Sequence, residues 1–213
     1  VTIRFTTMAR KQPAARLYDA VVAQDGTGDY TTVQAAIDAA PAGRTQPWLI
    51  FIKKGVYKGH HDIPANKPYL YLIGQDRNLV SISDNRLSGG DNAYKVNDGA
   101  TLTANSDNLY FEGINFVNSY GVEKNDGPQA LALYTLGDRV ALNKVGLLSY
   151  QDTWLTTTKL NNRHYIKDSW IEGAVDFIYG QGNVYLDQDT INIVRKSGGY
   201  IVAPNHPKET TWG

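Results

Sequence analysis

The sequence contains no cysteine. This absence excludes disulfide bonds, thiol nucleophiles and thiolate metal sites, but it leaves the cellular compartment open. The chain also has no excess charge of either sign, because its 21 Lys and Arg residues balance its 21 Asp and Glu residues. A balanced chain has no general attraction to nucleic acid or to anionic membranes. No apolar run approaches the roughly 18 residues of a membrane-spanning helix, so the chain is predicted not to span a membrane.

Signals for export and for a division into domains are absent as well. The chain begins at Val1 without a charged and then apolar signal segment, which indicates a processed or trimmed start. No Pro-rich, Ser-rich or strongly charged linker interrupts the composition. We therefore expect one domain over residues 1–213.

The residues that are present predict one short helix followed by many short strands. Thr32 is suited to cap the helix, and Pro41 is suited to stop it. The apolar face of this helix consists of Val33, Ala36, Ile37 and Ala40. The predicted strands are 48–53, 69–74, 79–83, 101–103, 109–116, 140–148, 164–171, 183–186 and 190–194. Gly, Asn and Asp separate most of them, so the sequence indicates an all-β fold.

A loose internal repeat suggests how these strands are arranged. Its units align on Phe111, Leu142, Ile166 and Leu186, which are 31, 24 and 20 residues apart. Steps of about 25 residues correspond to one coil of a three-sided parallel β-helix. An antiparallel sandwich is the commoner arrangement for short strands. The sequence lacks two-residue Asn-Gly or Asp-Gly turns between neighbouring strands, however, and this favours the β-helix.

Two aspartates at the edges of apolar strands are the leading catalytic candidates. Asp152 and Asp176 are 24 residues apart, so in a β-helix they lie on consecutive coils, about 5 Å apart along the stacking direction. Repulsion and partial burial separate the pKa values of two such carboxyls, leaving one ionised and one protonated. The pair therefore predicts a nucleophile and a general acid.

Two glutamines extend this set. Gln129 precedes Gln151 by 22 residues, again about one coil, which places two amides beside the acids. An amide donates hydrogen bonds to a developing oxyanion while staying neutral. Each residue alone also fits a structural role, as a turn aspartate or a glutamine ladder. Their joint one-coil spacing favours function without choosing a reaction.

Five ordered motifs resemble those of the pectin methylesterases, the carbohydrate esterases of family eight. They span nearly the whole chain from about Val21 and consist of 25–37, 55–57, 129–133, 151–153 and 176–180. The resemblance implies a right-handed parallel β-helix with a substrate cleft along one face. It also implies hydrolysis of the methyl esters of pectin, with release of methanol, by a secreted, periplasmic or extracellular enzyme.

The family pattern gives each candidate a role. Asp176 corresponds to the nucleophile, and Asp152 corresponds to the acid that protonates methanol and then activates water. Gln129 and Gln151 correspond to the amides that stabilise the oxyanion. No metal and no cofactor are implied. The expected partner is methyl-esterified pectin, bound by a monomer, with no nucleic acid and no membrane. Aromatic residues beside the motifs are candidates for sugar binding, namely Tyr150, Trp154, Phe177 and Tyr179.

The chain departs from the family pattern at three places. Gly59 stands where Gly-x-Tyr-x-Glu ends in an acid, and Tyr179 replaces a common Phe. The later Leu-Gly-Arg-Pro-Trp segment does not occur. We therefore expect an amino-terminal portion of the fold, truncated at its carboxy-terminal end, with little esterase activity alone.

Two other functions stay open at this stage. The first is a β-helical glycoside hydrolase acting on pectin through paired aspartates, which would produce new reducing ends. The second is a non-catalytic β-helix that binds polysaccharide.

Overall fold

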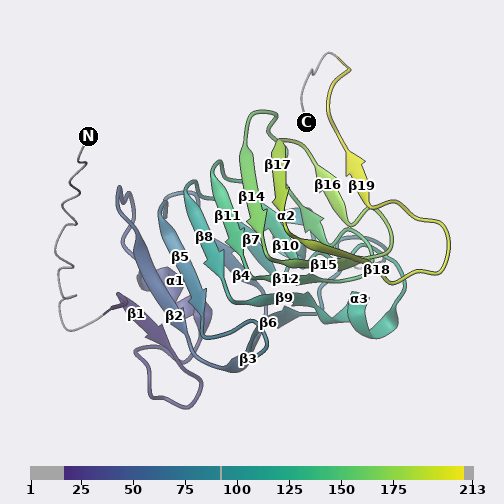
Figure 1. Cartoon of the computed structure of the whole chain (residues 1–213). Helices are drawn as coiled ribbons and strands as arrows, with labels where there is room; N and C mark the ends of the chain where they lie inside the picture. The colour runs from purple at the N-terminus through teal and green to yellow at the C-terminus, as the bar shows by residue number, and fades with distance from the viewer. Residues whose placement is uncertain (1–16, 92, 209–213) are drawn as a thin grey trace, which may run out of the picture.

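The computed structural model describes residues 17–91 and 93–208, and it is a parallel β-helix. Successive coils stack along one axis, from β1 in purple to β19 in yellow (Figure 1). Each coil from β2 onward contributes one strand to each of three sheets, and the strand pairs in the described ranges are parallel. An antiparallel sandwich is therefore excluded, and the predicted fold class is confirmed.

The first sheet, called sheet A, has seven strands. In spatial order they are β1 (Ala20–Val22), β2 (Trp48–Ile52), β5 (Leu70–Gly74), β8 (Leu109–Glu112), β11 (Val140–Asn143), β14 (Arg163–Lys167) and β17 (Asn183–Asp187).

The other two sheets have six strands each. Sheet B contains β3 (Gly55–Lys58), β6 (Val80–Asp84), β9 (Asn115–Asn118), β12 (Gly146–Leu148), β15 (Trp170–Gly173) and β18 (Thr190–Ile193). Sheet C contains β4 (His61–Ile63), β7 (Leu102–Ala104), β10 (Leu133–Thr135), β13 (Trp154–Leu155), β16 (Ile178–Gly180) and β19 (Val202–Pro204). The helices are α1 (Val33–Ala39), α2 (Val96–Gly99) and α3 (Ser119–Lys124). No helix in the described ranges is long and apolar enough to cross a membrane.

The equivalent residues of the sequence repeat pair with one another across neighbouring strands of sheet A. Phe111 pairs with Leu142, Leu142 with Ile166, and Ile166 with Leu186, so all four predicted equivalents are confirmed. The first three side chains are fully buried and point into the solenoid. Stacking like residues in this way gives every coil the same apolar interior, which stabilises it by burial.

Three of the predicted strands were too long. Segments 109–116, 140–148 and 164–171 each form two strands, one in sheet A and one in sheet B. A single left-handed residue joins the two strands in each case, with φ of 66° at Gly113, 51° at Lys144 and 49° at Asp168. One such residue turns the chain through a corner without interrupting the apolar pattern, so a lone Gly113, Lys144 or Asp168 did not mark the end of a strand.

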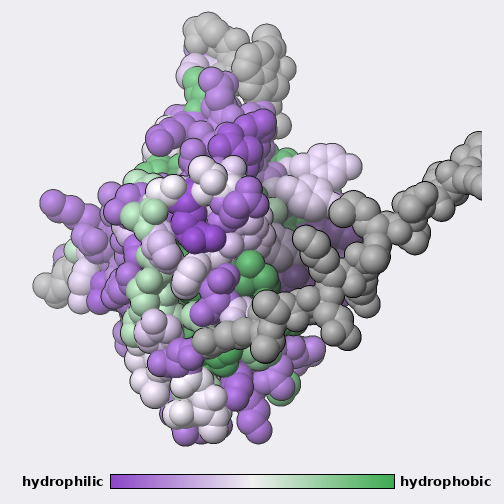
Figure 2. All heavy atoms as spheres, turned by 90° about the vertical axis from the view of Figure 1, so that its left-hand side faces the viewer, coloured by the Kyte–Doolittle hydropathy of each residue, from purple (hydrophilic) through white to green (hydrophobic). Residues whose placement is uncertain are grey.

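Helix α1 closes the first end of the solenoid, as the apolar spacing predicted. Thr32 is its N-cap and accepts a 3.3 Å hydrogen bond from the Ala35 amide. Its apolar face is buried against β1, β2 and β4. The surface visible at this end is largely hydrophilic, with small apolar patches between (Figure 2).

The C-terminal turn of α1 is held by a buried lysine, and this contact gives a stability prediction. The Lys67 ammonium donates to the carbonyls of Ile37, Asp38 and Ala40 at 2.7–2.8 Å. The Ile37 carbonyl also accepts from the Ala40 amide at 3.1 Å, and a buried ammonium with three acceptors is itself satisfied. Lys67→Met keeps the apolar stem but removes this donor from all three carbonyls. We expect the free energy of unfolding to fall by about 2–4 kcal/mol, measured by urea denaturation.

The exposed Lys58 provides the control, because its side chain makes no hydrogen bond within the described ranges. Lys58→Met should leave the urea midpoint unchanged. Equal midpoints for Lys67→Met and Lys58→Met would show that the three contacts contribute nothing to stability.

The last coil, formed by β17, β18 and β19, leaves apolar positions open to solvent. Leu186 is 40% exposed, whereas its register partner Ile166 is fully buried. Ile191 and Val202 are exposed in the same way beside their buried partners Ile171 and Ile178. The interior of the solenoid is therefore covered at the α1 end and uncovered beyond the last coil of the described chain.

Candidate active site

Asp152 and Asp176 lie at the corner where the chain passes from sheet B to sheet C. Gln151 bridges to Val175, and Trp154 pairs with Ile178, which places the two aspartates side by side on adjacent coils. Adjacent parallel strands are about 4.8 Å apart. The backbones of the two aspartates are therefore neighbours on consecutive coils.

The backbone at both aspartates is left-handed. The φ angle is 61° at Asp152 and 50° at Asp176, and aspartate tolerates this conformation better than most residues. The Asp152 amide donates to the Val175 carbonyl at 3.1 Å, and the Asp176 amide donates to the Tyr200 carbonyl at 2.7 Å. Because the same turn repeats on two coils, both side chains leave the solenoid in the same direction.

The two carboxyls differ in electrostatic environment. Burial first, and then the negative charge of Asp176, together raise the pKa of Asp152 to about 7. A second apolar cluster, separate from the main core, includes Leu131, Leu155 and Tyr179. Burial and then the charge of Asp152 raise the pKa of the Tyr179 hydroxyl, so this ring faces the acid. Asp152 is thus poised to exchange a proton near neutral pH.

The negative charge of Asp176 contributes to the raised pKa of Asp152. No Lys, Arg or His in ranges 17–91 and 93–208 forms an ion pair with Asp176. A half-buried carboxylate beside a proton donor has the chemistry of a nucleophile.

The two glutamines lie on consecutive coils beside the aspartates. The Ala130 amide donates to the Gln151 carbonyl at 3.1 Å, in the same way as the Asp152 amide donates to the Val175 carbonyl one coil later. Gln129 therefore lies beside Gln151, and the register shifts by one residue only afterwards, where Leu133 pairs with Trp154. Neither amide group has a hydrogen-bond partner in the part of the chain that the structure describes. Both are therefore free to donate to a ligand.

A loop that the sequence analysis did not single out supports Gln129. The Ser88 amide donates to the Gln129 carbonyl at 2.8 Å. The side chain of Gln129 packs on Gly89, where an added Cβ would come within 1.6 Å of the amide oxygen. The Ser-Gly-Gly run at 88–90 indicated a loop, but nothing local indicated which side chain it would contact.

This close approach makes Gly89 testable as a positioning residue. The φ of Gly89 lies outside the left-handed region, so alanine fits the backbone, but its methyl group would displace the Gln129 amide. For the reaction proposed below, we expect Gly89→Ala to lower kcat by roughly 10- to 100-fold with little change in KM. This is less than the roughly 10²- to 10³-fold loss from removing an oxyanion donor, because the amide is displaced and not removed. Initial rates of ester hydrolysis measure it.

A double variant separates displacement of Gln129 from a general defect. If Gly89 acts only through Gln129, adding Gly89→Ala to Gln129→Ala should cause no further loss. Fully additive losses would contradict the positioning role.

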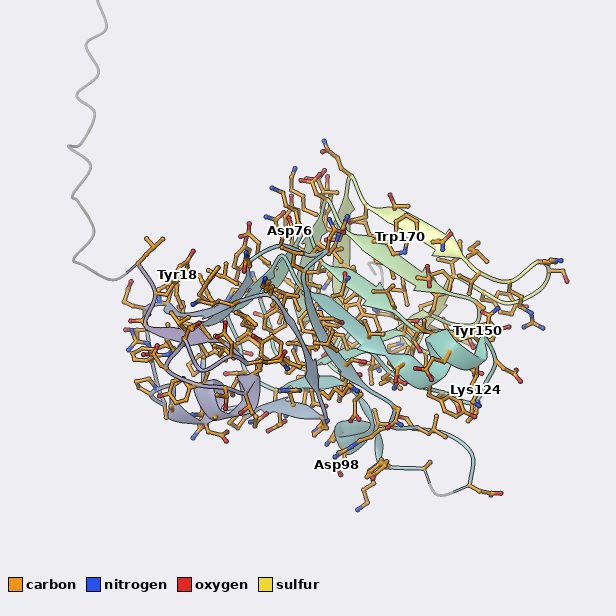
Figure 3. The ribbon with its side chains drawn as sticks, turned by 90° about the horizontal axis from the view of Figure 1, so that it is seen from below. Tyr18, Asp76, Asp98, Lys124, Tyr150 and Trp170 are labelled. Atoms are coloured by element: carbon orange, nitrogen blue, oxygen red, sulfur yellow. The ribbon has the colours of Figure 1, made fainter. Side chains whose placement is uncertain are left out.

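The four aromatic residues predicted to bind sugar do not all reach the surface. Tyr150 and Tyr179 are half-buried, so both keep accessible surface. Figure 3 shows Tyr150 beside α3, whose Gly121 packs against its backbone. Trp154 and Phe177 are fully buried in the main core, and the prediction that they contact sugar was wrong. Both occupy inward positions, which the aromatic identity alone did not reveal.

The Trp154 ring is anchored inside the solenoid. Its indole Nε1 donates to the Thr135 hydroxyl at 3.0 Å, and its ring meets His164 edge-on. In the described ranges, no group of three His, Asp or Glu side chains is arranged to hold a metal ion.

Comparison with known sequences identifies the family. The family model named Pectinesterase matches residues 19–202. A pectinesterase of Petunia integrifolia is 36% identical over 179 residues, covering 84% of this chain and 45% of that protein. Probable pectinesterase 29 of Arabidopsis thaliana is 32% identical over 194 residues, covering 85% of this chain and 55% of that protein. The chain thus spans about half the length of these relatives.

Solved structures agree with the sequences. Carrot pectin methylesterase superposes with a TM-score of 0.84 and 29% identity, covering 95% of this chain and 62% of that one. PemA of Erwinia chrysanthemi superposes with a TM-score of 0.77 and 28% identity, covering 93% and 64%. A pectin methylesterase variant in complex with a hexasaccharide matches with a TM-score of 0.77 and 29% identity, again covering 93% and 64%. By its sequence motifs, its coils and these matches, the chain belongs to the pectinesterase family.

Proposed function

We propose that this chain carries the catalytic residues of a pectin methylesterase, which hydrolyses the methyl esters of galacturonan to methanol and free carboxylates. The observation that carries the proposal is the pair Asp152 and Asp176, adjacent on consecutive coils, with the pKa of Asp152 raised to about 7. One protonated and one ionised carboxyl at such a distance supply both an acid and a nucleophile near neutral pH.

In the first step, a carboxylate oxygen of Asp176 attacks the ester carbonyl carbon. The bond from this carbon to the methoxy oxygen breaks, and the leaving oxygen takes the proton of Asp152 to form methanol. The acyl group remains on Asp176 as an anhydride. Gln129 and Gln151 donate hydrogen bonds to the carbonyl oxygen as it gains negative charge.

In the second step, Asp152 acts in its ionised form. It removes a proton from water as the water oxygen attacks the acyl carbon, and the bond to Asp176 breaks. Asp152 is protonated again and Asp176 leaves as a carboxylate, so both return to their starting states. The released galacturonic acid then ionises in water. No step requires a group beyond these side chains and water.

The proposed substrate is a chain of methyl-esterified galacturonate. A related pectin methylesterase has been solved with a hexasaccharide bound, and it superposes over 93% of this chain. Tyr150 and Tyr179 are the aromatic residues near the aspartates that keep accessible surface, so we assign sugar contacts to them rather than to Trp154 or Phe177. Because such a polysaccharide is a cell-wall polymer, we propose that the enzyme acts outside the cytoplasm, in the periplasm or the extracellular space.

The products distinguish this function from its rivals. Incubated with highly methylated pectin, the purified chain should release methanol without new reducing ends. Reducing ends without methanol would identify a glycoside hydrolase, and binding of pectin with neither product would identify a non-catalytic protein. Either result would overturn the proposal.

We expect this chain alone to hydrolyse methyl esters slowly. Asp176 has no cationic partner in the described ranges, so nothing there orients its carboxylate or balances its charge beside Asp152. Methanol release should be detectable only at high enzyme concentration and long incubation. A rate equal to that of carrot pectin methylesterase, assayed side by side, would contradict this part.

A further inference from the structure

The outer face of sheet A carries a column of tyrosines that the proposed reaction does not use. In register across the sheet, Tyr71 pairs with Tyr110, Tyr110 with Ala141, Ala141 with Tyr165, and Tyr165 with Tyr185. Sheet A forms one side of the coil stack (Figure 1), whereas Asp152 and Asp176 lie at the corner between sheets B and C. The column is therefore separate from the candidate active site.

The rings of this column are exposed yet fixed. Tyr165 is 39% and Tyr185 is 66% exposed, and their rings stack with centroids 5.8 Å apart and planes 15° apart. The Tyr165 hydroxyl donates to Asp187 at 2.6 Å, and the Tyr110 hydroxyl donates to Glu112 at 2.6 Å. Anchored aromatic rings present a flat apolar surface with little conformational entropy left to lose on binding.

Ala141 interrupts the column and opens two hollows beside it. One has a volume of about 510 Å³ and is bordered by Ala141, Tyr165 and Tyr185. The other, of about 330 Å³, lies among Tyr110, Ala141 and Tyr165. Tyr110 and Tyr165 are two strands apart, about 10 Å, whereas a sugar ring in contact on both sides needs roughly 7–8 Å. A pyranose ring therefore fits above Ala141.

The charges around the two hollows are balanced, but not every cation is paired. The charged lining residues are Arg139, Arg163, Lys144, Lys167 and Asp168. Asp138 binds both arginines and Asp187 binds Lys167, whereas Lys144 forms no ion pair within the described ranges. The Arg163 side chain is mostly exposed, and its Nη1 donates to no residue in the described ranges.

We propose that this face, called the tyrosine face and defined by Tyr110, Ala141, Arg163, Tyr165 and Tyr185, is a second polysaccharide site that binds de-esterified galacturonan. Sugar rings stack on the tyrosines, and the free carboxylates pair with the available donors, Arg163 Nη1 and Lys144. The aromatic platform matches a sugar chain, and the two cationic donors match its carboxylates better than an uncharged methyl ester. The identity of the polymer rests on the proposed function: the ligand is its product. The site would hold the enzyme on polymer that it has already processed.

The test measures binding of an unesterified oligogalacturonate to the whole chain by isothermal titration calorimetry. Tyr165→Ala should weaken binding roughly fivefold or more, and Arg163→Gln should weaken it to a similar extent and reduce its dependence on salt. Tyr165→Phe keeps the ring and should bind like the parent chain. Tyr18→Ala removes a ring that stacks on Phe51 and lines neither hollow, so it is the matched control and should bind like the parent as well.

Further measurements separate this site from the aspartate pair. Asp176→Asn should leave oligogalacturonate binding unchanged, and a fully methylated oligosaccharide should bind Tyr165→Ala and the parent chain equally. Methanol release from a short methylated oligomer should be unaffected by Tyr165→Ala. A chain that fails to release methanol but shows the Tyr165 and Arg163 effects would overturn the proposed function and keep the tyrosine face.

Two outcomes would overturn the tyrosine face itself. One is equal affinity of Tyr165→Ala, Arg163→Gln and the parent chain, with far-ultraviolet circular dichroism showing that all are folded. The other is a parent chain that dimerises in sedimentation, becomes monomeric with Tyr165→Ala, and binds oligogalacturonate equally well in both forms. The face would then be an interface between two copies.

Discussion

Asp176→Asn is expected to reduce methanol release from pectin by about 10³-fold or more, to the background rate. The amide is nearly the same shape as the carboxylate but has no charge and is not a nucleophile, so no acyl intermediate forms. Losing a nucleophile commonly costs this much or more, because the other groups act only in concert with it. Methanol assayed at matched enzyme concentrations measures the loss, with long incubations for the parent chain.

The fold itself supplies a matched control for this substitution. Asp168 has the same left-handed backbone as Asp176, with φ of 49° against 50°, but it lies at the corner between sheets A and B. Asparagine tolerates this conformation as well as aspartate does. Asp168→Asn should therefore retain the parent rate. Similar rates for Asp176→Asn and the parent chain would rule out Asp176 as the nucleophile.

The architecture was readable from the sequence because a β-helix repeats. Phe111, Leu142 and Ile166 recur at coil spacing since each must fill the same interior position, and the register confirms this. The corners between sheets A and B were not readable. A corner made by one left-handed residue such as Lys144 leaves no Gly or Pro signal, and so two strands were predicted as one.

The adjacency of the candidate catalytic residues was also predictable, because it follows from the length of one coil. Asp152 and Asp176 are one coil apart, and a coil-length spacing translates directly into adjacency. Spacing does not report which way a side chain points, and so Trp154 was placed at the surface although it is buried. Spacing also does not report contacts across long loops, and the packing of Gly89 on Gln129 belongs to that class.

The electrostatics of Asp152 connect catalysis, pH and stability. Its carboxyl ionises in the unfolded chain near 3.8, but in the folded chain it keeps its proton until the pH nears its pKa of about 7. Between these two values the folded state binds more protons, so stability falls as the pH rises through this window. Above pH 7 the ionised Asp152 lowers the free energy of unfolding by roughly 2–4 kcal/mol relative to low pH.

Asp152→Asn should therefore separate function from stability. We expect methanol release to fall by about 10²- to 10⁴-fold, since neither proton transfer is then catalysed. At pH 8 we expect the urea midpoint to rise, because the asparagine is never charged. Methanol assays and urea denaturation of the same preparation test both halves. A variant that loses activity and also stability at pH 8 would contradict the electrostatic account of Asp152.

The pH profile of the parent chain gives an independent test of the same assignment. Acylation requires protonated Asp152, so kcat/KM should decline on the alkaline side with an apparent pKa near 7. In Asp176→Asn the neighbouring charge is gone, and the pKa of Asp152, followed by NMR, should move down. It should remain above 3.8, because burial is the larger cause of the shift. An unchanged pKa in this variant would mean that the two carboxyls do not interact. Asp152 and Asp176 could then not act as acid and nucleophile in one active site.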